Sequence, residues 1–597
     1  MEKKNKQNIL ELLMRLWNHV EKKRQKQFIL VFLLMVITSF AEIISISAVF
    51  PFLGVLTAPN KIFNINEIQG VLGKFNITSP EEMLLPISIG FGAAALIAGI
   101  LRILLLLVST RLSFSVGAEL GASIYKRTLY QPYETHCNRN SSEVISAVSN
   151  KTNGVIYSII FPCLTILSNC ILLVATISLL VSVNPKITLI IFGGFGLIYI
   201  LIIQVNRKVL KRNSLNIAKE TTLVIKALQE GLGCVRELII DGAQKTYCKV
   251  YEEADNSLRK SQASQLFIGQ SPRYAVETLG ICLITTVAYF LTEEEGGIAI
   301  ALPLLGALAM GAQRILPVLQ SAYGSWINIY GQQNILKDVV TLLEQKIPEY
   351  TKQELNKKHI FEKEIELLNI NFKYMSNSEN SLNNIELKIK KGARIGFVGA
   401  TGSGKTTLLD IIMSLLKPTE GNLLVDGKII NYENQQEWRN NIAHVPQTLF
   451  LIDGTVAENI AFGLEEKDID YERVIEVAKQ AHLAETIENW PLKYKTLVGE
   501  RGVRMSGGQR QRIGIARALY KKVGVIVLDE ATSALDNETE NNIMKEIEKL
   551  DSKITILIIA HRITTLKHTD NIVVLEKGKI EKITKYEQLM YTNKVIK

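Results

Sequence analysis

Long apolar runs dominate the first 330 residues of this 597-residue chain. A bilayer is spanned by a helix of about 20 mainly apolar residues, because every backbone polar group must be satisfied inside the helix. Six runs meet this requirement, at approximately Phe28–Leu56, Leu84–Thr110, Tyr157–Val183, Ile187–Asn206, Phe267–Leu291 and Gly297–Tyr323. They predict six membrane-spanning helices, and the short Asn184-Pro185-Lys186 turn makes the third and fourth of them antiparallel neighbours.

The chain changes character after residue 330. Charge density rises between Gln332 and Lys358, and the remainder reads like a soluble α/β protein. A chain of this length also exceeds the usual size of one domain. We therefore expect a cytoplasmic segment at 1–27, an all-α transmembrane domain at 28–330, a linker at 331–360 and an α/β domain at 361–597.

Lysine and arginine gather on one side of the predicted spans. The segment before the first span and the segment between the fourth and fifth spans are both basic, whereas the last opposite loop reads Glu293-Glu294-Glu295. Basic loops stay on the cytoplasmic side, so both termini are predicted to be cytoplasmic. The net charge of +10 therefore comes from basic segments that flank the spans. It indicates a membrane protein and not a protein that binds nucleic acid.

A glycine-rich motif lies between a strand-like run at 395–398 and a helical run at 408–416. It consists of Gly399, Ala400, Thr401, Gly402, Ser403, Gly404, Lys405, Thr406 and Thr407. Backbone N–H groups of such a loop close around phosphates, and the dipole of the following helix favours their charge. Lys405 is expected to reach the β- and γ-phosphates and the Thr406 hydroxyl to ligate Mg²⁺. The motif predicts a nucleoside triphosphate site.

A second apolar strand, at 523–528, ends in an acidic pair. Asp529 is placed to hold Mg²⁺, directly or through water. Glu530 is placed to polarise the attacking water, as a general base does in phosphoryl transfer. Together with the glycine-rich loop, this pair predicts hydrolysis of the bound nucleotide.

The segment Ser506, Gly507, Gly508 and Gln509, preceded by Met505, resembles the signature motif of ABC ATPases, normally written LSGGQ. Methionine in place of leucine is a conservative apolar change. Other parts of the family pattern follow in order: Tyr374, Gln447, Val498–Gly502, Ser533–Asp536 and His561. The resemblance implies that Tyr374 stacks on adenine, that Gln447 joins Thr406 and Asp529 around Mg²⁺, and that His561 is the catalytic switch histidine.

The ABC resemblance covers the whole C-terminal domain and implies a two-chain machine. In the family, the signature of one subunit caps the ATP held by the P-loop of the other, so a chain with one ATPase domain is expected to work as a homodimer. Exporters of this family carry six spans before the ATPase. The resemblance also implies that two intracellular loops dock beside the Q-loop, the segment that contains Gln447. These loops are near Pro132–Asn138 and Leu228–Ile239.

Three arginines lie inside predicted spans, where a charge costs about 2.5 to 3.5 kcal/mol on insertion scales. Arg102, Arg273 and Arg314 each lie about 17 to 19 residues from the external end of their span, which is roughly 25 to 29 Å along a helix. They are therefore expected at one level, near the cytoplasmic headgroups. Guanidinium binds phosphate bidentately, which suits an anionic lipid headgroup. Snorkelling, or neutralisation by a carboxylate such as Glu277, is the alternative interpretation.

The first span, from Ser39 to Phe52, resembles that of PglK-type flippases of lipid-linked oligosaccharides. Ser271–Arg273 and Arg314–Pro317 resemble their counterparts in the fifth and sixth spans, and an external helix around 65–75 fits as well. This resemblance implies movement of an undecaprenyl-pyrophosphate-linked glycan from the inner to the outer leaflet. Ser321 departs from the pattern, since a basic residue is expected there.

Other exporters remain open alternatives, with peptides, drugs or other lipids as substrates. An ATP-gated channel or regulator is a further alternative, although Glu530 and His561 match the catalytic pattern and favour a pump. The chain shows neither a transit peptide nor an internal duplication. These features are compatible with the inner membrane of a bacterium.

Overall fold

The computed structural model describes residues 8–57, 79–183, 185–292, 315–348, 361–374, 379–560 and 562–591. The chain divides into two compact units. The helical unit contains residues 1–131 and 139–346, and the α/β unit contains 347–597 together with Pro132–Asn138. The predicted external helix around 65–75, Arg314, His561 and most of the sixth predicted span lie outside the described residues.

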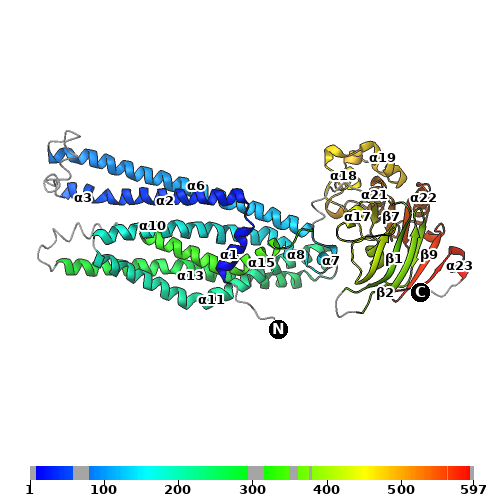
Figure 1. Ribbon diagram of the computed structural model, residues 1–597, viewed down its shortest axis with the longest axis horizontal. Coiled ribbons are helices and arrows are strands. Elements are labelled where there is room, and N and C mark those ends of the chain that lie inside the picture. Colours follow the sequence, from blue (N-terminus) through cyan, green and yellow to red (C-terminus); the bar gives the residue numbers. More distant parts are fainter. Residues whose placement is uncertain are drawn as a thin grey trace. The chain divides into compact units, whose positions relative to one another are not determined.

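The helical unit is built from long helices (Figure 1). Its main helices are α1 (Ile9–Asn18), α2 (Lys22–Ser47), α3 (Val49–Thr57), α6 (Leu84–Leu129), α8 (Ser141–Ser146), α9 (Thr152–Val155), α10 (Phe161–Val183), α11 (Pro185–Gly233), α12 (Val235–Ile240), α13 (Gln244–Thr292) and α15 (Gln333–Leu343). Residues 315–331 are also helical. The π-helical segments Ala147–Lys151 and Ile156–Ile160 join α8, α9 and α10 into one nearly continuous rod.

Among the described residues, three helical stretches are long and apolar enough to cross a membrane: Lys22–Ser47, Leu84–Leu129 and Ser141–Leu179. They contain the first three predicted spans in whole or in part. The fourth and fifth predicted spans lie within α11 and α13. Each of these two helices has 49 residues, or about 73 Å at 1.5 Å per residue. They therefore extend well beyond a bilayer core of about 30 Å.

Proline sets two helix boundaries that differ from the predictions. The first predicted span is not one helix, because α2 ends at Ser47 and α3 begins at Val49. Pro51 in the first turn of α3 has no N–H to continue the ladder of α2. The predicted turn at residues 184–186 is shorter than expected, since α11 begins at Pro185, the first helical position that proline favours.

The first 27 residues, which are predicted to form a cytoplasmic segment, contain a short amphipathic helix, α1. Its Leu12 and Leu16 are buried in a core with Leu336, Val340 and Leu343 of α15. Arg15 donates from Nε to Glu344 Oε1 over 2.7 Å, at the end of α15. The N-terminal helix is thus packed on the last helix of the helical unit.

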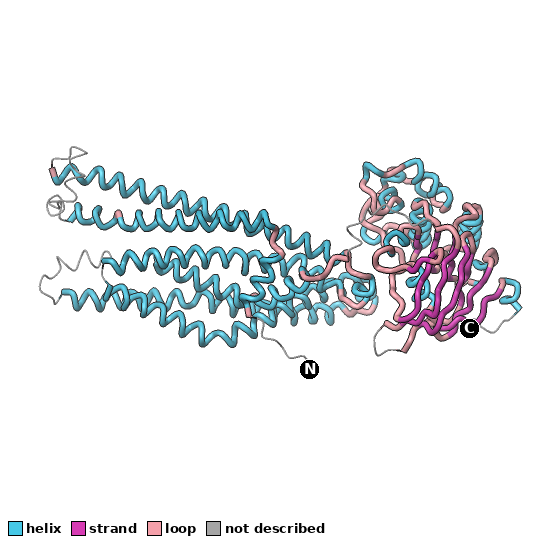
Figure 2. The backbone as a smooth tube through the Cα atoms, in the orientation of Figure 1, coloured by secondary structure: helices cyan, strands magenta, loops and turns pink. Residues whose placement is uncertain are grey.

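The α/β unit contains two sheets, drawn in magenta in Figure 2. The antiparallel sheet has the order β2-β1-β4-β5, and the larger sheet has the order β10-β9-β3-β8-β7-β6. The strands are β1 (Glu364–Phe372), β2 (Leu382–Lys390), β3 (Arg394–Val398), β4 (Glu420–Val425), β5 (Lys428–Ile429), β6 (Ile442–Val445), β7 (Val525–Asp529), β8 (Thr555–Ile559), β9 (Asn571–Glu576) and β10 (Lys579–Thr584). Strands β6, β7, β8, β3 and β9 run parallel, and β10 is antiparallel to β9.

Helices cover the larger sheet on both faces. They are α16 (Lys405–Ile412), α17 (Gln435–Arg439), α18 (Val456–Ile460), α19 (Tyr471–Gln480), α20 (Ala484–Glu488), α21 (Gly507–Tyr520), α22 (Asn537–Glu548) and α23 (Tyr586–Tyr591). Every residue of β7 and β8 is buried, as expected for parallel strands covered on two sides. One apolar core contains α18, α19 and α21, and the other contains α16 and the antiparallel sheet. The fold class is therefore the predicted one: a helical membrane domain fused to an α/β ATPase-like domain.

Candidate functional site: a nucleotide site in the α/β unit and arginines in the membrane helices

The glycine-rich loop joins the carboxyl end of β3 to α16, where ligands bind in open parallel sheets. Gly404 precedes the helix with φ +98°, and a Cβ there would lie 2.8 Å from Ser381 O. A Cβ on Gly399 would lie 2.3 Å from Leu575 O and 2.6 Å from Ser403 Oγ. Glycine is therefore required at both positions by the close approach of the backbone.

Two polar side chains of this loop, Ser403 and Lys405, make no hydrogen bond to a residue outside the loop among the described residues. The Lys405 ammonium donates to two carbonyls of its own loop, Gly399 O at 2.8 Å and Ala400 O at 3.0 Å. Burial lowers the pKa of Lys405, and the charges of Glu530 and Asp529 oppose this effect. The buried Ser403 Oγ has no hydrogen-bond partner among the described residues. A cradle of backbone N–H groups with an orphan hydroxyl and a buried cation fits a phosphate chain.

The acidic pair lies at the carboxyl end of the interior strand β7. Asp529 is the last residue of this strand, and Glu530 follows it with φ +50°. The Glu530 carboxylate accepts a hydrogen bond of 2.6 Å from Gln447 Nε2. The structure thus brings together two predicted site residues that are 83 positions apart. Gln447 donates its amide N–H₂ here, which leaves its carbonyl oxygen as the group that can ligate a cation.

Tyr374 lies at the rim of the phosphate loop. Its hydroxyl is 3.0 Å from Thr407 Oγ1, and its ring packs edge to face on Phe372. The residue is 43% exposed. An exposed aromatic ring anchored next to the phosphate loop is suited to stacking on a base.

The signature segment forms the N-terminus of α21. Ser506 caps the helix: its Oγ accepts from Gln509 N over 3.2 Å, and Gln509 Oε1 accepts from Ser506 N over 2.8 Å. This capping box fixes the loop that leads into the helix. A Cβ on Gly508 would lie 3.4 Å from Ala534 O, so this residue packs closely on the segment Ser533–Asp536, the D-loop of the family. Among the described residues, no hydrogen bond or ion pair joins Ser506–Gln509 to the P-loop of the same chain.

Two residues that the sequence analysis missed tie this site together. Gln511 donates to Ser533 Oγ over 3.0 Å and accepts from Ala534 N over 2.9 Å, which links α21 to the D-loop. The buried Glu540 of α22 accepts from Arg562 Nη1 over 2.7 Å. Their signals in the sequence are weak: Gln511 is a polar residue just inside an otherwise apolar helix face, and Glu540 is one of several acids in its segment.

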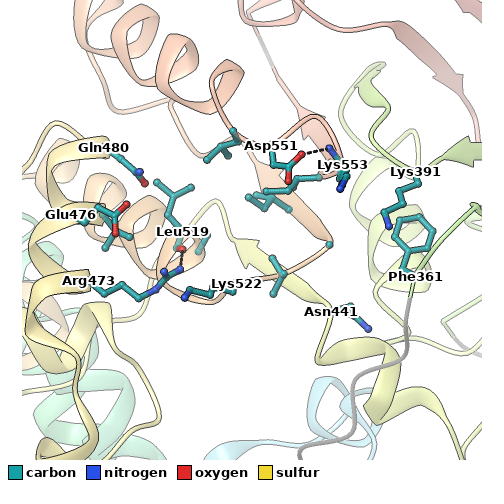
Figure 3. A pocket seen from close by; sticks show the side chains of 17 residues that line it. Phe361, Lys391, Asn441, Arg473, Glu476, Gln480, Leu519, Lys522, Asp551 and Lys553 are labelled. Carbon is teal, nitrogen blue, oxygen red and sulfur yellow. Dashed lines mark hydrogen bonds between the residues drawn. The ribbon is translucent and has the colours of Figure 1, made fainter.

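One cavity of the α/β unit lies away from the nucleotide site. It has a volume of about 570 Å³ and lies at the amino ends of the parallel strands, next to Phe361, Lys391, Lys553 and Gly524 (Figure 3). Arg473 on its wall donates to Leu519 O over 2.9 Å and so satisfies the C-terminus of α21. None of the predicted ATP-site residues lines this cavity.

Of the three arginines predicted to bind a headgroup, the two within the described residues, Arg102 and Arg273, each lie next to a carboxylate. Arg102 on α6 lies 3.8 Å from Glu42 on α2, measured from Nη1 to Oε1. Arg273 on α13 donates from Nε to Glu277 Oε1 over 2.8 Å. The pairing of Arg273 with Glu277 agrees with the neutralisation that the sequence analysis left open. The sequence analysis did not predict Glu42 as the partner of Arg102.

Two family models match the chain. The model described as the ABC transporter transmembrane region matches residues 28–292, and the model described as ABC transporter matches residues 382–533. Together they cover the long apolar helices and the segment from β2 through the acidic pair of β7.

Among similar proteins, an ATP-dependent lipid A-core flippase of Cupriavidus pinatubonensis is 27% identical over 84% of each chain. A protein of Bacillus subtilis named for multidrug export, YgaD, is 42% identical, but over 38% of this chain and 39% of its own length. The solved structure of a bacterial Atm1-family ABC exporter with ATP bound aligns over 96% of both chains, with 21% identity and a TM-score of 0.75. That similarity establishes the fold.

The phosphate loop, the acidic pair and the long apolar helices therefore agree with both family models and with the shared fold. The protein is a multi-pass membrane protein with an ATP-hydrolysing domain. The chain belongs to the ABC transporter family, with a transmembrane region followed by an ATPase domain.

Proposed function

We propose that two copies of this chain form a pump that hydrolyses ATP and moves an anionic lipid-linked oligosaccharide from the inner to the outer leaflet. The observation that carries the substrate proposal is the position of Arg102 and Arg273 on helices that contain predicted spans, with 63% and 58% of their side chains exposed. An arginine in a span is costly, and exposed guanidinium groups bind phosphate well. Their presence is explained if they meet the headgroup of a lipid.

The ATP site would work through residues already in place. Lys405 would exchange its loop carbonyls for the phosphates, and Tyr374 would stack on adenine. Glu530, held by Gln447 over 2.6 Å, would orient and polarise the attacking water. His561, the third catalytic residue in the proposal, lies outside the described residues.

Thr406, Gln447 and Asp529 would hold Mg²⁺. Hydroxyl, amide carbonyl and carboxylate oxygens are the hard ligands that this ion prefers, so the donor set fits. When bound, the ion would neutralise charge on the transferred phosphoryl group.

The proposal of a homodimer rests on two features of the chain. No hydrogen bond or ion pair joins the signature segment to its own P-loop among the described residues, so a second copy would be needed to complete a site. The connection of α11, α12 and α13 also exposes apolar side chains: Leu232, Val235, Ile239 and Ile240 are 73%, 50%, 63% and 72% exposed. Surface of this kind marks a protein contact. The short helix α7 (Tyr133–Cys137) lies in the other predicted docking loop, and it is grouped with the α/β unit.

The membrane in question is proposed to be the inner membrane of a bacterium, with both termini in the cytoplasm. The basic segments before α2 and along α11 support this orientation. The relative named as a lipid A-core flippase supports a lipid substrate in general, since its similarity extends over 84% of this chain. Export of drugs or peptides is the competing proposal, and it predicts no role for the arginines.

The test measures ATP turnover of the purified protein in liposomes, with and without a polyprenyl-pyrophosphate oligosaccharide. We expect stimulation in the wild type and loss of stimulation, with basal turnover retained, in Arg102→Ala, Arg273→Ala and Arg314→Ala. No stimulation of the wild type would exclude the lipid proposal and favour drugs or peptides, whereas equal stimulation in all variants would exclude the arginines as the headgroup site. Glu530→Gln is expected to abolish turnover altogether, and normal turnover in this variant would contradict the assignment of the catalytic carboxylate.

A further inference from the structure

The membrane helices contain two arginine–carboxylate pairs with a common design. In each pair the guanidinium is the more exposed partner: Arg102 and Glu42 have 63% and 6% of their side chains exposed, and Arg273 and Glu277 have 58% and 39%. One edge of each guanidinium faces a carboxylate, and the rest of its surface is open. The carboxylate therefore occupies part of the surface that an anion would use.

Both carboxylates have polar surroundings that persist without the arginine. Gln320 Nε2 lies 3.4 Å from Glu277 Oε1 and donates to it. Glu42 lies on a buried polar stripe of α2 with Thr38, Ser39 and Ser45, all less than 6% exposed. A carboxylate that loses its arginine partner therefore remains among polar groups rather than against hydrocarbon, which lowers the cost of releasing the arginine.

We propose that Glu42 and Glu277 are built-in counter-ions that make the arginines selective for headgroups of high negative charge. This inference rests on the proposed function, because it assigns a role to carboxylates at the same site. With no substrate, the carboxylates neutralise Arg102 and Arg273 in a medium where bare charge is costly. A bound anion must take each guanidinium away from its carboxylate.

The competition discriminates between anions by their charge. A monoanionic phosphodiester, as in common anionic phospholipids, gains one unit of charge attraction and loses the existing pair, so the exchange gives little net energy. A pyrophosphate carries two or more negative charges, so at either arginine its attraction exceeds that of the lost carboxylate, and it binds the guanidinium bidentately. The carboxylates thus weaken binding of both ligands, but only the phosphodiester falls below useful affinity.

The experiment uses Glu42→Gln and Glu277→Gln, which keep the shape of the side chain and remove its charge. ATP turnover is measured in phosphatidylcholine vesicles against increasing undecaprenyl pyrophosphate, with undecaprenol as the uncharged comparison. Further arms contain phosphatidylglycerol, a monoanionic lipid, and inorganic pyrophosphate, which separates a lipid headgroup from a free anion. Since Glu277 is partly exposed, its variant remains informative if Glu42→Gln does not fold.

We expect the half-saturating concentration of undecaprenyl pyrophosphate to fall about tenfold in each variant, or about 1.4 kcal/mol. We also expect phosphatidylglycerol, which should not stimulate the wild type, to stimulate both variants. Glu119→Gln is the matched control. Glu119 pairs with Arg24 over 2.7 Å and joins the same two helices, α2 and α6, but lies outside the predicted spans, so its removal should change neither response.

The outcomes separate this inference from the proposed function. If the wild type responds to undecaprenyl pyrophosphate but both Gln variants match it for every lipid, the counter-ion role is wrong and the lipid proposal stands. If the wild type does not respond and the variants do, the carboxylates control the arginines and the wild-type substrate is another anion. If no form responds to any anion, both proposals are wrong.

Discussion

At the scale of single residues, Asp410 is the most perturbed carboxyl group of the ATPase domain. It lies on α16, five residues after the P-loop lysine. Burial, with repulsion from Asp529 as the second cause, raises the pKa of Asp410 from 3.8 to about 6. Between these two values the folded chain holds a proton that the unfolded chain has released. The folded state binds more protons in this window, so the free energy of unfolding falls as the pH rises from about 4 to about 6.

Replacing this residue should remove that dependence. We expect Asp410→Asn to match the wild type near pH 4 and to be more stable above pH 6, by on the order of 1 to 3 kcal/mol. The measurement is the thermal unfolding midpoint of the ATPase domain within the full-length protein in detergent, compared between the two forms from pH 4.5 to 8. A constant difference across this range would show that the asparagine acts through packing rather than charge.

At the scale of elements, one buried side chain of α21 makes two hydrogen bonds to the D-loop. Gln511 is 6% exposed and uses both ends of its amide, toward Ser533 Oγ and Ala534 N. Gln511→Ala would leave these groups unpaired, at a cost of about 1 to 3 kcal/mol. We expect slower ATP hydrolysis, measured at saturating ATP, and little change in nucleotide affinity, because the P-loop does not contact this residue.

A glutamine of the same domain provides the comparison. Gln436 on α17 pairs with Asn440, four residues away, and does not join two elements through this bond. Gln436→Ala should therefore leave the turnover number near that of the wild type. If Gln511→Ala hydrolyses ATP as fast as Gln436→Ala does, the hydrogen bonds between Gln511 and the D-loop have no part in turnover.

The elements also show what the sequence can predict. The phosphate loop is specified locally, because a strand, glycines at set spacing and a helix are adjacent in the chain. The pair Arg273–Glu277 was also visible, since residues four apart share a helix face. The pair Arg102–Glu42 was not, because it depends on how α2 and α6 are rotated against each other. Likewise, Pro51 was present in an apolar run whose length alone suggested one helix.

At the scale of the whole molecule, the proposed homodimer leads to a prediction about mixed subunits. If the signature acts on the ATP of the other copy, a chain with Glu530→Gln and a chain with Gly508→Asp complement each other. Each variant is expected to be inactive alone: the first lacks its catalytic carboxylate, and the second has a side chain where a Cβ already approaches Ala534 O at 3.4 Å. In a mixed dimer, one site combines Glu530→Gln of the first chain with the altered signature of the second chain, so it carries both defects. The other site combines the unaltered parts of the two chains and is intact.

Two mixtures distinguish action on the partner's ATP from action within one chain, with ATP turnover after co-reconstitution as the measurement. For action on the partner, the mixture of the two single variants should exceed either parent. A chain carrying both substitutions should then inactivate the wild-type copy it pairs with, because each of the two sites receives one defect. For action within a chain, both results reverse: the single variants stay inactive together, and the wild-type copy keeps its own site. The direction of the two changes therefore decides whether the ATP sites are shared between copies.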